Sequence, residues 1–419
     1  MSKRSLTIGL FGFGTVGEGL YRVLEQKPSF GARIQKVCIK HPEKKRFAPA
    51  HLFTTDCEAL LQDPDIDVIV ELIDDAEAAF EIVSTALRNG KAVVSANKAL
   101  VAAHFKELLQ LQQQTGKSFL YEAACCASIP VLRNLEEYYD NDLLQGLRGI
   151  VNGSTNYILS QVTGKGFNLE QALLEAQLEG FAESDPTVDL NGTDAANKLV
   201  ILLAHAYGLV AKREELLYSG IQALHPSDIT YAREKGYRIR LVAQAKKLED
   251  GRVAAFVLPQ FVKPDDPLFH VEQEYNGVLI ESGLADTQAF YGKGAGAFPT
   301  SSAVLSDLSA LRYNYRYEYK KHYSGEKLSL GNDFLLRVYV SFEGLFHVPH
   351  ELFERIEEWY SADGRCYVTG TVQYSKLRGW DWWRRRGASL ILLPDAIAEE
   401  STDLTEAGNE RLLADVLTA

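Results

Sequence analysis

Two charged residues one helical turn apart, Asp194 and Lys198, are the first candidates for chemistry in this sequence. They lie in a periodic apolar stretch that predicts a helix over 193–207, so both side chains share one face of that helix. The acid could hold the lysine and aim its amine into a cleft. The alternative is an exposed ion pair that contributes little to stability, and the two residues taken alone favour that alternative.

A polar loop precedes this predicted helix and is rich in carboxylates. Within twelve residues the chain carries Glu183, Asp185, Asp189 and Asp194, and the loop over 183–192 also contains a proline and a glycine. A charge that leaves water must be paired, so a substrate ammonium group would require acceptors of this kind. The cluster therefore predicts a site for a small cationic or zwitterionic substrate.

A glycine-rich segment follows a predicted strand over 6–11 and opens directly into a predicted helix over 15–26. Its residues are Gly12, Phe13, Gly14, Thr15, Val16 and Gly17. In this context the pattern is typical of a dinucleotide site, because the first glycine makes the tight turn, the second lets the backbone approach the pyrophosphate and the third allows close packing. The pyrophosphate would then rest on the helix N-terminus. A glycine-rich turn without a ligand is the alternative.

The end of the second predicted strand, over 34–40, bears on the choice of dinucleotide. An acid at this place normally hydrogen-bonds the ribose 2′-hydroxyl of NAD. Here Lys40 stands there, and Lys44, Lys45 and Arg46 follow. Because a 2′-phosphate would suit these cations, we predict a preference for NADP over NAD. A solvated basic loop is the alternative.

Strands and helices alternate through residues 1–148, which predicts an N-terminal Rossmann-type domain with a doubly wound parallel sheet. The further elements expected there are strands over 68–73, 92–95 and 119–122 and helices over 76–89 and 100–115. A second α+β domain for catalysis and dimerisation is expected over 149–320, although a helix near 300–315 should return to the first domain. Its expected elements are a helix over 169–179 and strands over 253–262 and 278–282.

Four blocks of the sequence closely resemble the homoserine dehydrogenase family, in the same order along the chain. They are Gly90–Leu100, Gly149–Leu159, Gly180–Lys198 and Gly294–Val304, and the resemblance covers about residues 5–310. It implies reversible NAD(P)-dependent hydride transfer between L-homoserine and L-aspartate 4-semialdehyde, in the biosynthesis of threonine, methionine and isoleucine. It also implies a homo-oligomer, a dimer or a tetramer, built through the second domain.

The same resemblance assigns roles to individual residues. It makes Lys198 the general acid/base, with Lys98 a second lysine at the reacting oxygen, and so favours the catalytic interpretation of the Asp194–Lys198 pair. The implied substrate-binding residues are Gly180, Glu183, Asp189 and Asp194. The implied cofactor-binding residues are those of the glycine-rich segment together with Lys40, Ser95, Lys98 and Gly296.

The resemblance further implies a structural monovalent cation, Na⁺ or K⁺. Its ligands would be the carboxylate of Glu122 and the main-chain carbonyls of Cys125, Ala127 and Ile129. The family usually has glycines in this stretch, and their loss here restricts the backbone. A Gly-Gly pair is also expected after the third long strand, where this chain has Asp74-Asp75 and so places negative charge near the expected nicotinamide. Local capping by Glu122 is the alternative to a cation site.

The C-terminal residues 330–419 are expected to form a small α+β module, a degenerate ACT-like unit of βαββαβ order. The pattern predicts strands over 334–342 and 365–373 with a helix over 351–360, but the ligand loop expected near Gly344 has no match. The Trp380–Arg386 segment fits packing or a subunit contact better than a nucleotide site. Vicinal Cys125 and Cys126 are expected to be buried thiols, rather than the nucleophile of an aldehyde dehydrogenase.

Bulk composition narrows the class of protein. The chain has 419 residues, a net charge of −12 and five cysteines, and its sequence begins without a signal-peptide pattern. These features predict a cytoplasmic enzyme that binds neither nucleic acid nor membrane. Two other functions remain open, namely another NAD(P)-dependent amino-acid or semialdehyde dehydrogenase, and a catalytically inactive NADP-binding regulatory protein.

Overall fold

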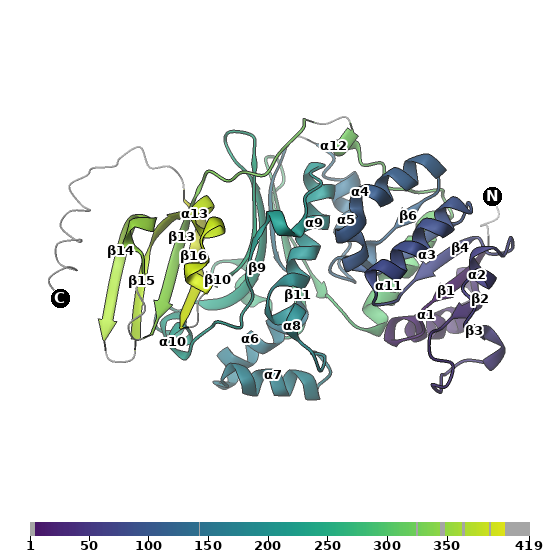
Figure 1. Ribbon diagram of the computed structural model, residues 1–419, viewed down its shortest axis with the longest axis horizontal. Helices are drawn as coiled ribbons and strands as arrows, with labels where there is room; N and C mark the ends of the chain where they lie inside the picture. The colour runs from purple at the N-terminus through teal and green to yellow at the C-terminus, as the bar shows by residue number, and fades with distance from the viewer. Residues whose placement is uncertain are drawn as a thin grey trace. The chain divides into compact units, whose positions relative to one another are not determined.

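The computed structural model describes residues 5–141, 143–323, 326–343, 348–362, 365–384 and 387–398 (Figure 1). The chain divides into two compact units. The first consists of the described residues within Met1–Gln145, Asn197–Glu215 and Val278–Leu328, and the second of those within Gly146–Ala196, Leu216–Gly277 and Ser329–Ala419. Within the described ranges, no helix has the length and apolar character needed to cross a membrane.

The first unit contains the predicted parallel sheet, in the order β3-β2-β1-β4-β5-β6. Its strands are β1 (Leu6–Phe11), β2 (Ala32–Cys38), β3 (Phe53–Thr54), β4 (Val68–Glu71), β5 (Ala92–Ser95) and β6 (Phe119–Leu120). Every residue of β4 is buried, as expected for a strand covered on both faces. The strand order reverses between β1 and β4, which is where ligands bind in sheets of this kind. The Rossmann-type fold class is thus confirmed.

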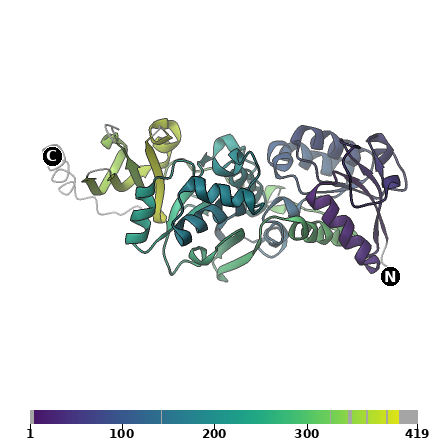
Figure 2. The same ribbon diagram turned by 90° about the horizontal axis from the view of Figure 1, so that it is seen from below.

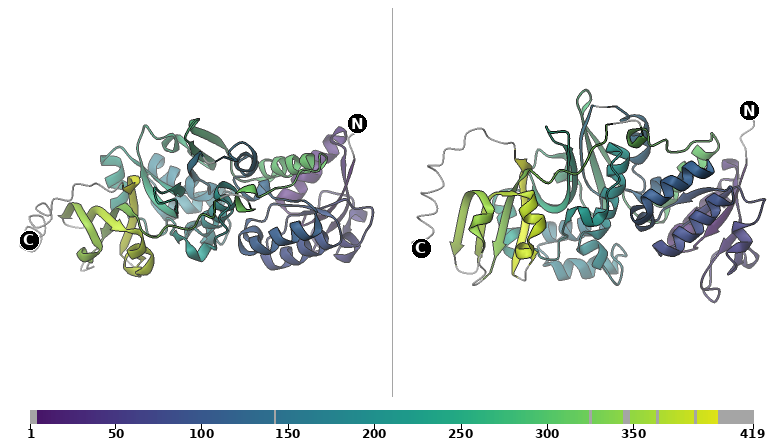
Figure 3. Two further views of the ribbon diagram at one scale, coloured as in Figure 1. Left: turned by 90° about the horizontal axis from the view of Figure 1, so that it is seen from above. Right: turned by 45° about the horizontal axis from the view of Figure 1, so that its top comes forward.

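Helices cover both faces of this sheet (Figures 2 and 3). The helices of the first unit are α1 (Thr15–Gln26), α2 (Glu58–Leu61), α3 (Ala76–Arg88), α4 (Lys98–Thr115), α5 (Leu132–Glu137), α11 (Ala297–Leu311) and α12 (Lys320–Tyr323). Helix α11 lies against α1, since a Cβ on Gly19 would stand 3.1 Å from the carbonyl oxygen of Ala297 and Ser301 Oγ is 3.2 Å from the carbonyl of Val16. The helix expected near 300–315 therefore packs within the first unit.

The second unit is built on a mixed sheet, in the order β12-β11-β7-β9-β10-β16-β13-β15-β14, with β8 paired to β10. The strands concerned are β7 (Leu144–Ile150), β8 (Leu217–Tyr218), β9 (Arg238–Lys247), β10 (Val253–Val262), β11 (Tyr275–Ser282), β12 (Asp286–Lys293), β13 (Leu335–Phe342), β14 (Phe353–Ala362), β15 (Arg365–Gln373) and β16 (Ala388–Ala398). All ten residues of β10 are buried, because it pairs on both edges and is covered on both faces. Residues of β12 and part of β11 belong to the first unit.

The helices of the second unit precede its long strands in the chain. They are α6 (Gly153–Lys165), α7 (Leu169–Leu178), α8 (Thr187–Leu190) and α10 (Pro226–Glu234), and α13 (Tyr374–Gly379) follows later. Helix α9 (Thr193–Tyr207) begins in the second unit and continues into the first. The expected boundaries at 148 and 320 therefore differ from those of the compact units, because α9 and residues 278–328 pack with the nucleotide-binding fold.

The C-terminal region is more β-rich than the sequence predicts. The helix expected over 351–360 is wrong, because these residues form β14, an edge strand antiparallel to β15. The spacing of Phe353, Ile356 and Trp359 resembles one face of a helix, yet these side chains pack on the apolar core of the sheet. Tertiary contacts thus override the local pattern. Between β13 and β14 the structure describes residues 343 and 348–352, which include the 3-10 turn His350–Leu352, and Gly344 lies outside the described residues.

The aromatic segment that precedes β16 contains two buried tryptophans and one exposed tryptophan. Trp382 and Trp383 are buried in the core of the sheet, whereas Trp380 is exposed. Arg385 and Arg386 lie outside the described residues. The described part of Trp380–Arg386 therefore has the packing role expected for it, and residues 399–419 of the expected module are not described.

Candidate active site

Two of the three glycines of the phosphate loop are required by close backbone contacts, and the third leaves its backbone open. Gly12 has a φ of +90°, and a Cβ there would stand 2.6 Å from the carbonyl oxygen of Leu72. A Cβ on Gly17 would stand 2.4 Å from the carbonyl oxygen of Gly12, whereas a Cβ on Gly14 would meet nothing within 4 Å. The backbone at Gly14 is therefore open to a ligand at the start of α1, as pyrophosphate binding requires.

The other residues of this loop lie at the same end of the sheet. Thr15 is exposed as the first residue of α1, and the Val16 carbonyl accepts a hydrogen bond from Ser301. The Phe13 ring packs edge-on against Phe53, with 5.1 Å between their centroids. The loop is thereby held to β3 on one side and to α11 on the other. The turn at Gly296, with a φ of +112°, begins α11 in the same unit.

The basic loop after β2 is exposed and partly organised by its own contacts. Lys40 is exposed directly after the strand, and Arg46 donates hydrogen bonds of 2.7 Å to the carbonyls of Lys44 and His41. The Arg46 guanidinium also lies 5.5 Å above the Phe53 ring. The loop thus keeps several cations at the end of β2, the place expected to face the adenosine ribose.

A buried carboxylate lies at the end of β4, beside β5. Glu71 is fully buried, accepts a 2.6 Å hydrogen bond from the Ser95 hydroxyl and accepts another from the Ile73 amide at 2.7 Å. Burial raises the pKa of Glu71 to about 7, although both hydrogen bonds oppose that shift. Ser95 also accepts from the Asn97 amide at 3.0 Å. Asn97 caps α4, whose first residue is the half-buried Lys98.

Glu71 was not singled out in the sequence analysis, and its contact with Ser95 spans 24 residues of chain. The position of Glu71 as the last residue of a buried strand is the signal that could have found it. Asp75 caps α3 by accepting a 2.9 Å hydrogen bond from the Ala78 amide, so part of the unexpected negative charge is stabilised by a helix N-terminus.

Helix α9 carries the candidate lysine. Asp194 and Lys198 are both buried, with exposed fractions of 3% and 7%, and their spacing places them on one face of α9. This burial removes the alternative of an exposed ion pair. The Cys125 thiol lies 3.7 Å from the main-chain carbonyl of Lys198 and so packs against this turn of the helix. Cys125 and Cys126 are both buried, as expected for structural thiols.

Two of the predicted substrate carboxylates meet at one side chain. The Asn152 amide nitrogen donates to Asp189 Oδ1 at 2.7 Å and to Asp194 Oδ2 at 2.8 Å. Asn152 is itself buried and caps α6, because its oxygen accepts from the Thr155 amide. Its role was not predicted, although its place between a strand and a helix start is the usual signal of such a cap.

The turn that follows α7 carries the remaining predicted residues. Gly180 has a φ of +78°, and the exposed Glu183 has its carbonyl bonded to Gln177 Nε2 at 3.0 Å. Asp185 is also exposed and binds Thr187, at the start of α8. Close backbone packing fixes α8, since a Cβ on Gly220 would stand 1.7 Å from the carbonyl oxygen of Leu190. The structure joins Asp189 and Asp194 through the Asn152 amide and leaves Glu183 in the adjoining loop.

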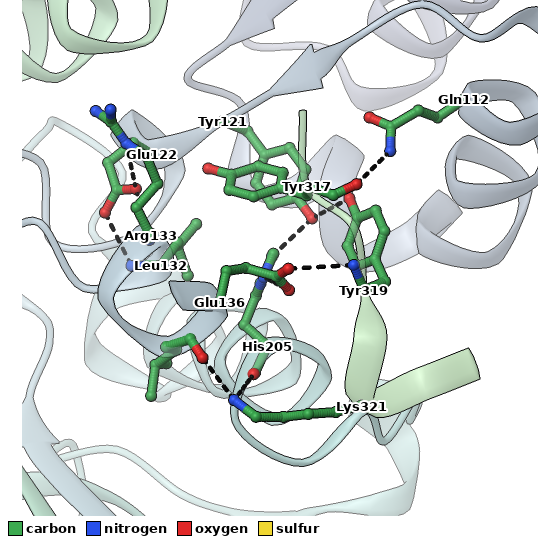
Figure 4. A network of polar contacts seen from close by, with 11 residues as sticks. Gln112, Tyr121, Glu122, Leu132, Arg133, Glu136, His205, Tyr317, Tyr319 and Lys321 are labelled. Carbon is green, nitrogen blue, oxygen red and sulfur yellow. Dashed lines mark hydrogen bonds and ion pairs between the residues drawn. The ribbon is translucent and has the colours of Figure 1, made fainter. Parts of the chain in front are cut away.

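A buried polar network anchors the far end of α9 in the first unit (Figure 4). His205 is fully buried, with Nδ1 at 2.7 Å from Glu136 Oε1 and Nε2 at 2.8 Å from the Tyr121 hydroxyl. Tyr121 bonds in turn to the Tyr319 hydroxyl at 2.8 Å, and the Tyr319 amide donates to Glu136 at 3.1 Å. Lys321 donates to the His205 carbonyl at 3.0 Å. The network therefore fixes the helix that carries Lys198.

The expected cation ligands lie just after β6. Glu122 is buried, and its carboxylate accepts hydrogen bonds from the amides of Leu132 at 2.8 Å and Arg133 at 3.0 Å (Figure 4). It thus caps α5, while Arg133 Nε lies 3.7 Å from Glu122 Oε2. Burial raises the pKa of Glu122, although its contacts with Leu132 and Arg133 partly offset that rise. Local capping, the alternative to a cation site, is therefore present in the structure.

The loop after Glu122 is strained where the family has glycines. Cys126 and Ala127 have φ values of +54° and +37°, which L-residues rarely adopt. Such strain persists where surrounding structure demands it, often at a ligand site. Each carboxylate oxygen of Glu122 has a second lone pair for a ligand. No cluster of three or more His, Cys, Asp or Glu side chains suits a metal within the described ranges, so any cation here depends on main-chain carbonyls.

Comparison with known proteins agrees with these features. A model described as the homoserine dehydrogenase NAD-binding domain matches residues 12–122, and a homoserine dehydrogenase model matches residues 130–309. The homoserine dehydrogenase of Bacillus subtilis (strain 168) is 35% identical over 322 residues, 75% of this chain and 74% of that protein. That of Synechocystis sp. is 38% identical over 314 residues, 73% of this chain and 72% of that protein.

Solved structures give the same result. The structure of a homoserine dehydrogenase from Thiobacillus denitrificans matches with a TM-score of 0.82 and 29% identity, over 93% of this chain and 98% of that one. A hyperthermophilic archaeal homoserine dehydrogenase in complex with NADPH matches with a TM-score of 0.63 and 25% identity, over 75% of this chain and 99% of that one.

Proposed function

The chain belongs to the homoserine dehydrogenase family, and from this premise we propose how its own residues carry out the reaction. The enzyme is an NAD(P)-dependent oxidoreductase that acts on a CH–OH group and interconverts L-homoserine and L-aspartate 4-semialdehyde. This reaction belongs to the biosynthesis of threonine, methionine and isoleucine. The alternatives left open by the sequence, a different dehydrogenase or an inactive regulatory protein, are not favoured.

We propose that Lys198 is the general acid/base. Gly12–Gly17 would hold NAD(P)⁺, which would supply the hydride acceptor for the substrate carbon. The hydroxyl proton must leave in the same reaction, and the Lys198 amine takes it, then returns it in the reverse direction. Lys198 is suited to this role because it is buried and lies on the anchored helix α9. Lys98, at the start of α4, is proposed as the second lysine at the reacting oxygen.

The observation that carries this proposal is the pair of aspartates joined by Asn152. One of them, Asp194, lies one helical turn before Lys198 on α9. Asn152 holds Asp189 and Asp194 at 2.7 and 2.8 Å, so the two carboxylates remain close despite their like charge. Such a pair can bind the α-ammonium group of homoserine. Glu183 and the Gly180 backbone complete the proposed substrate-binding set.

The preference for NADP over NAD remains a proposal, supported by Lys40 and the cations that follow it. We further propose that Glu122 and the carbonyls of Cys125, Ala127 and Ile129 hold Na⁺ or K⁺. The left-handed backbone at Cys126 and Ala127 supports this site, because strain of this kind often persists where a ligand binds. The ion would stabilise the loop and take no part in hydride transfer. A homo-oligomer is likewise proposed from the family resemblance, and a cytoplasmic location from the composition of the chain.

Substrate analogues test the proposed site. We expect the enzyme to reduce NADP⁺ with L-homoserine, without any requirement for phosphate. With 4-hydroxybutanoate, which lacks the ammonium group, kcat/KM should fall by at least about 100-fold, because Asp189 and the buried Asp194 lose the charge that they pair. Equal use of both alcohols would contradict the role of Asp189 and Asp194, and phosphate-dependent activity would indicate a phosphorylating semialdehyde dehydrogenase.

A further inference from the structure

Two cysteines lie next to each other at the adenosine end of the nucleotide-binding unit. Cys38 is the last residue of β2, and Cys57 immediately precedes α2. Their Sγ atoms are 3.3 Å apart, although 19 residues separate them in the chain. Cys38 is 7% exposed, whereas Cys57 is exposed. The pair therefore combines a buried thiol with a neighbour that solvent can reach.

The geometry is close to that of a disulfide. An S–S bond is ~2.05 Å long, so the two sulfur atoms would have to approach by about 1.2 Å. Burial, followed by the hydrogen bond with Cys57, raises the pKa of the Cys38 thiol to about 12. Cys38 is thus a poor first nucleophile, and an oxidant would meet Cys57 first.

The pair is coupled directly to the phosphate loop. The carbonyl of Cys38 accepts a 3.1 Å hydrogen bond from the amide of Gly12, the first glycine of that loop. The next residue, Ile39, donates to the carbonyl of Thr54 at 2.9 Å, and Lys40 follows. A bond between the sulfurs would close residues 39–56 into a loop that contains the proposed 2′-phosphate contacts.

We propose that Cys38 and Cys57 form a reversible disulfide that weakens binding of the dinucleotide when it is oxidised. This inference rests on the proposed roles of Gly12 and Lys40 in binding the cofactor. The contacts that shape the loop are formed with the sulfurs 3.3 Å apart, so a movement of about 1.2 Å must be absorbed by the end of β2 and by the basic loop. Both are displaced from the arrangement that fits the cofactor.

The oxidant is a low-molecular-weight disulfide, and the exchange balances with it. The Cys57 thiolate attacks one sulfur of the oxidant, forms a mixed disulfide and releases one small thiolate. Cys38 loses its proton to solvent and attacks the Cys57 sulfur, which forms the Cys38–Cys57 bond and releases the second thiolate. Two protein thiols are oxidised and one small disulfide is reduced to two thiols.

The test uses the full-length enzyme, equilibrated in glutathione redox buffers. Peptide mapping should show a Cys38–Cys57 cross-link that dithiothreitol removes. The Kd for NADPH, measured by fluorescence titration, should rise at least about fivefold on oxidation, the lower end of ordinary coupling between two sites. By linkage, saturating NADPH should raise the midpoint potential of the pair by ~30 mV for each tenfold change in Kd.

Matched variants separate this pair from the other thiols. Cys57→Ser should abolish both the cross-link and the redox dependence of the Kd, whereas Cys366→Ser should preserve both. Absence of the cross-link, or an unchanged Kd when it forms, would overturn the inference and leave the proposed function intact. Failure of the reduced enzyme to bind either NADPH or NADH would overturn the proposed cofactor site together with this inference.

Discussion

Replacement of His205 with leucine tests the buried network that anchors α9. The imidazole is fully buried and makes hydrogen bonds of 2.7 Å to Glu136 and 2.8 Å to Tyr121. Leucine fills a similar volume but leaves the Glu136 carboxylate without its main partner. Glu136 would keep the Tyr319 amide at 3.1 Å, so its charge would be only partly compensated.

The expected loss of stability follows from these contacts. A hydrogen bond to a charged group contributes ~1.5–3 kcal/mol and a neutral one ~0.5–1.5 kcal/mol, and an unpaired buried carboxylate adds a desolvation cost. Breaking a buried pair on one side usually costs ~3–5 kcal/mol, and we expect His205→Leu to fall in that range. The free energy of unfolding in urea at pH 7 measures it.

The pH dependence gives a second check. Burial raises the pKa of Glu136, but the His205 hydrogen bond and charge, the Tyr319 amide and the Lys321 charge together lower it below its ordinary value. A lowered carboxyl pKa contributes stability that is present above the unfolded value of ~4.3 and is lost as pH falls through the folded pKa. The difference between wild type and His205→Leu should therefore shrink below about pH 4.

A His–Glu pair in the same unit whose carboxylate is exposed supplies the matched control. His104 Nε2 lies 3.0 Å from Glu77 Oε1, but the Glu77 side chain is 80% exposed. His104→Leu should therefore cost less than about 1 kcal/mol. If His205→Leu also costs less than about 1 kcal/mol, the network does not anchor α9 and the reasoning is refuted.

Three further predictions concern the cofactor, the buried carboxylate of Glu71 and the cation. Lys40→Asp should weaken NADP binding far more than NAD binding, because it replaces a phosphate partner with a repelling charge. A wild-type enzyme that prefers NAD tenfold would contradict the proposed preference for NADP. Because burial raises the pKa of Glu71 to about 7, the free energy of unfolding of the wild type should fall by roughly 3 kcal/mol between pH 4 and pH 8. Urea titrations of Glu71→Gln should lack that fall, and an equal dependence of stability on pH in the two proteins would count against the raised pKa. Replacing Na⁺ and K⁺ with an organic cation should lower the Tm, and Glu122→Gln should abolish that difference; a wild-type Tm indifferent to these ions would leave Glu122 as a helix cap.

The parts of the fold governed by local sequence were predictable. Gly17 is required by the carbonyl of Gly12 within the same loop, and α9 begins and ends where its apolar period does. Strand β14 was not predictable in this way, since its helix-like spacing is overridden by pairing with β15. The edge of a sheet is decided by neighbours that lie elsewhere in the chain.

The site was predictable as a set of residue types and only partly as an arrangement. Asp189 and Asp194 were expected together, but the amide of Asn152 that joins them lies 37 and 42 residues away. The contact between His205 and Tyr121 spans 84 residues. Periodicity and turn signals describe neighbours within a helix or a loop, so contacts of this range appear only in the folded chain.

The most direct test of the catalytic proposal is the turnover of Lys198→Ala with L-homoserine, measured alongside its affinity for NADPH. We predict that kcat falls by about 10²–10⁴, the usual contribution of a positioned proton-transfer group, while the Kd for NADPH stays unchanged. Lys212→Ala, at an exposed lysine just beyond α9, should keep wild-type kcat. Wild-type turnover in Lys198→Ala would contradict the assignment of Lys198 as the general acid/base.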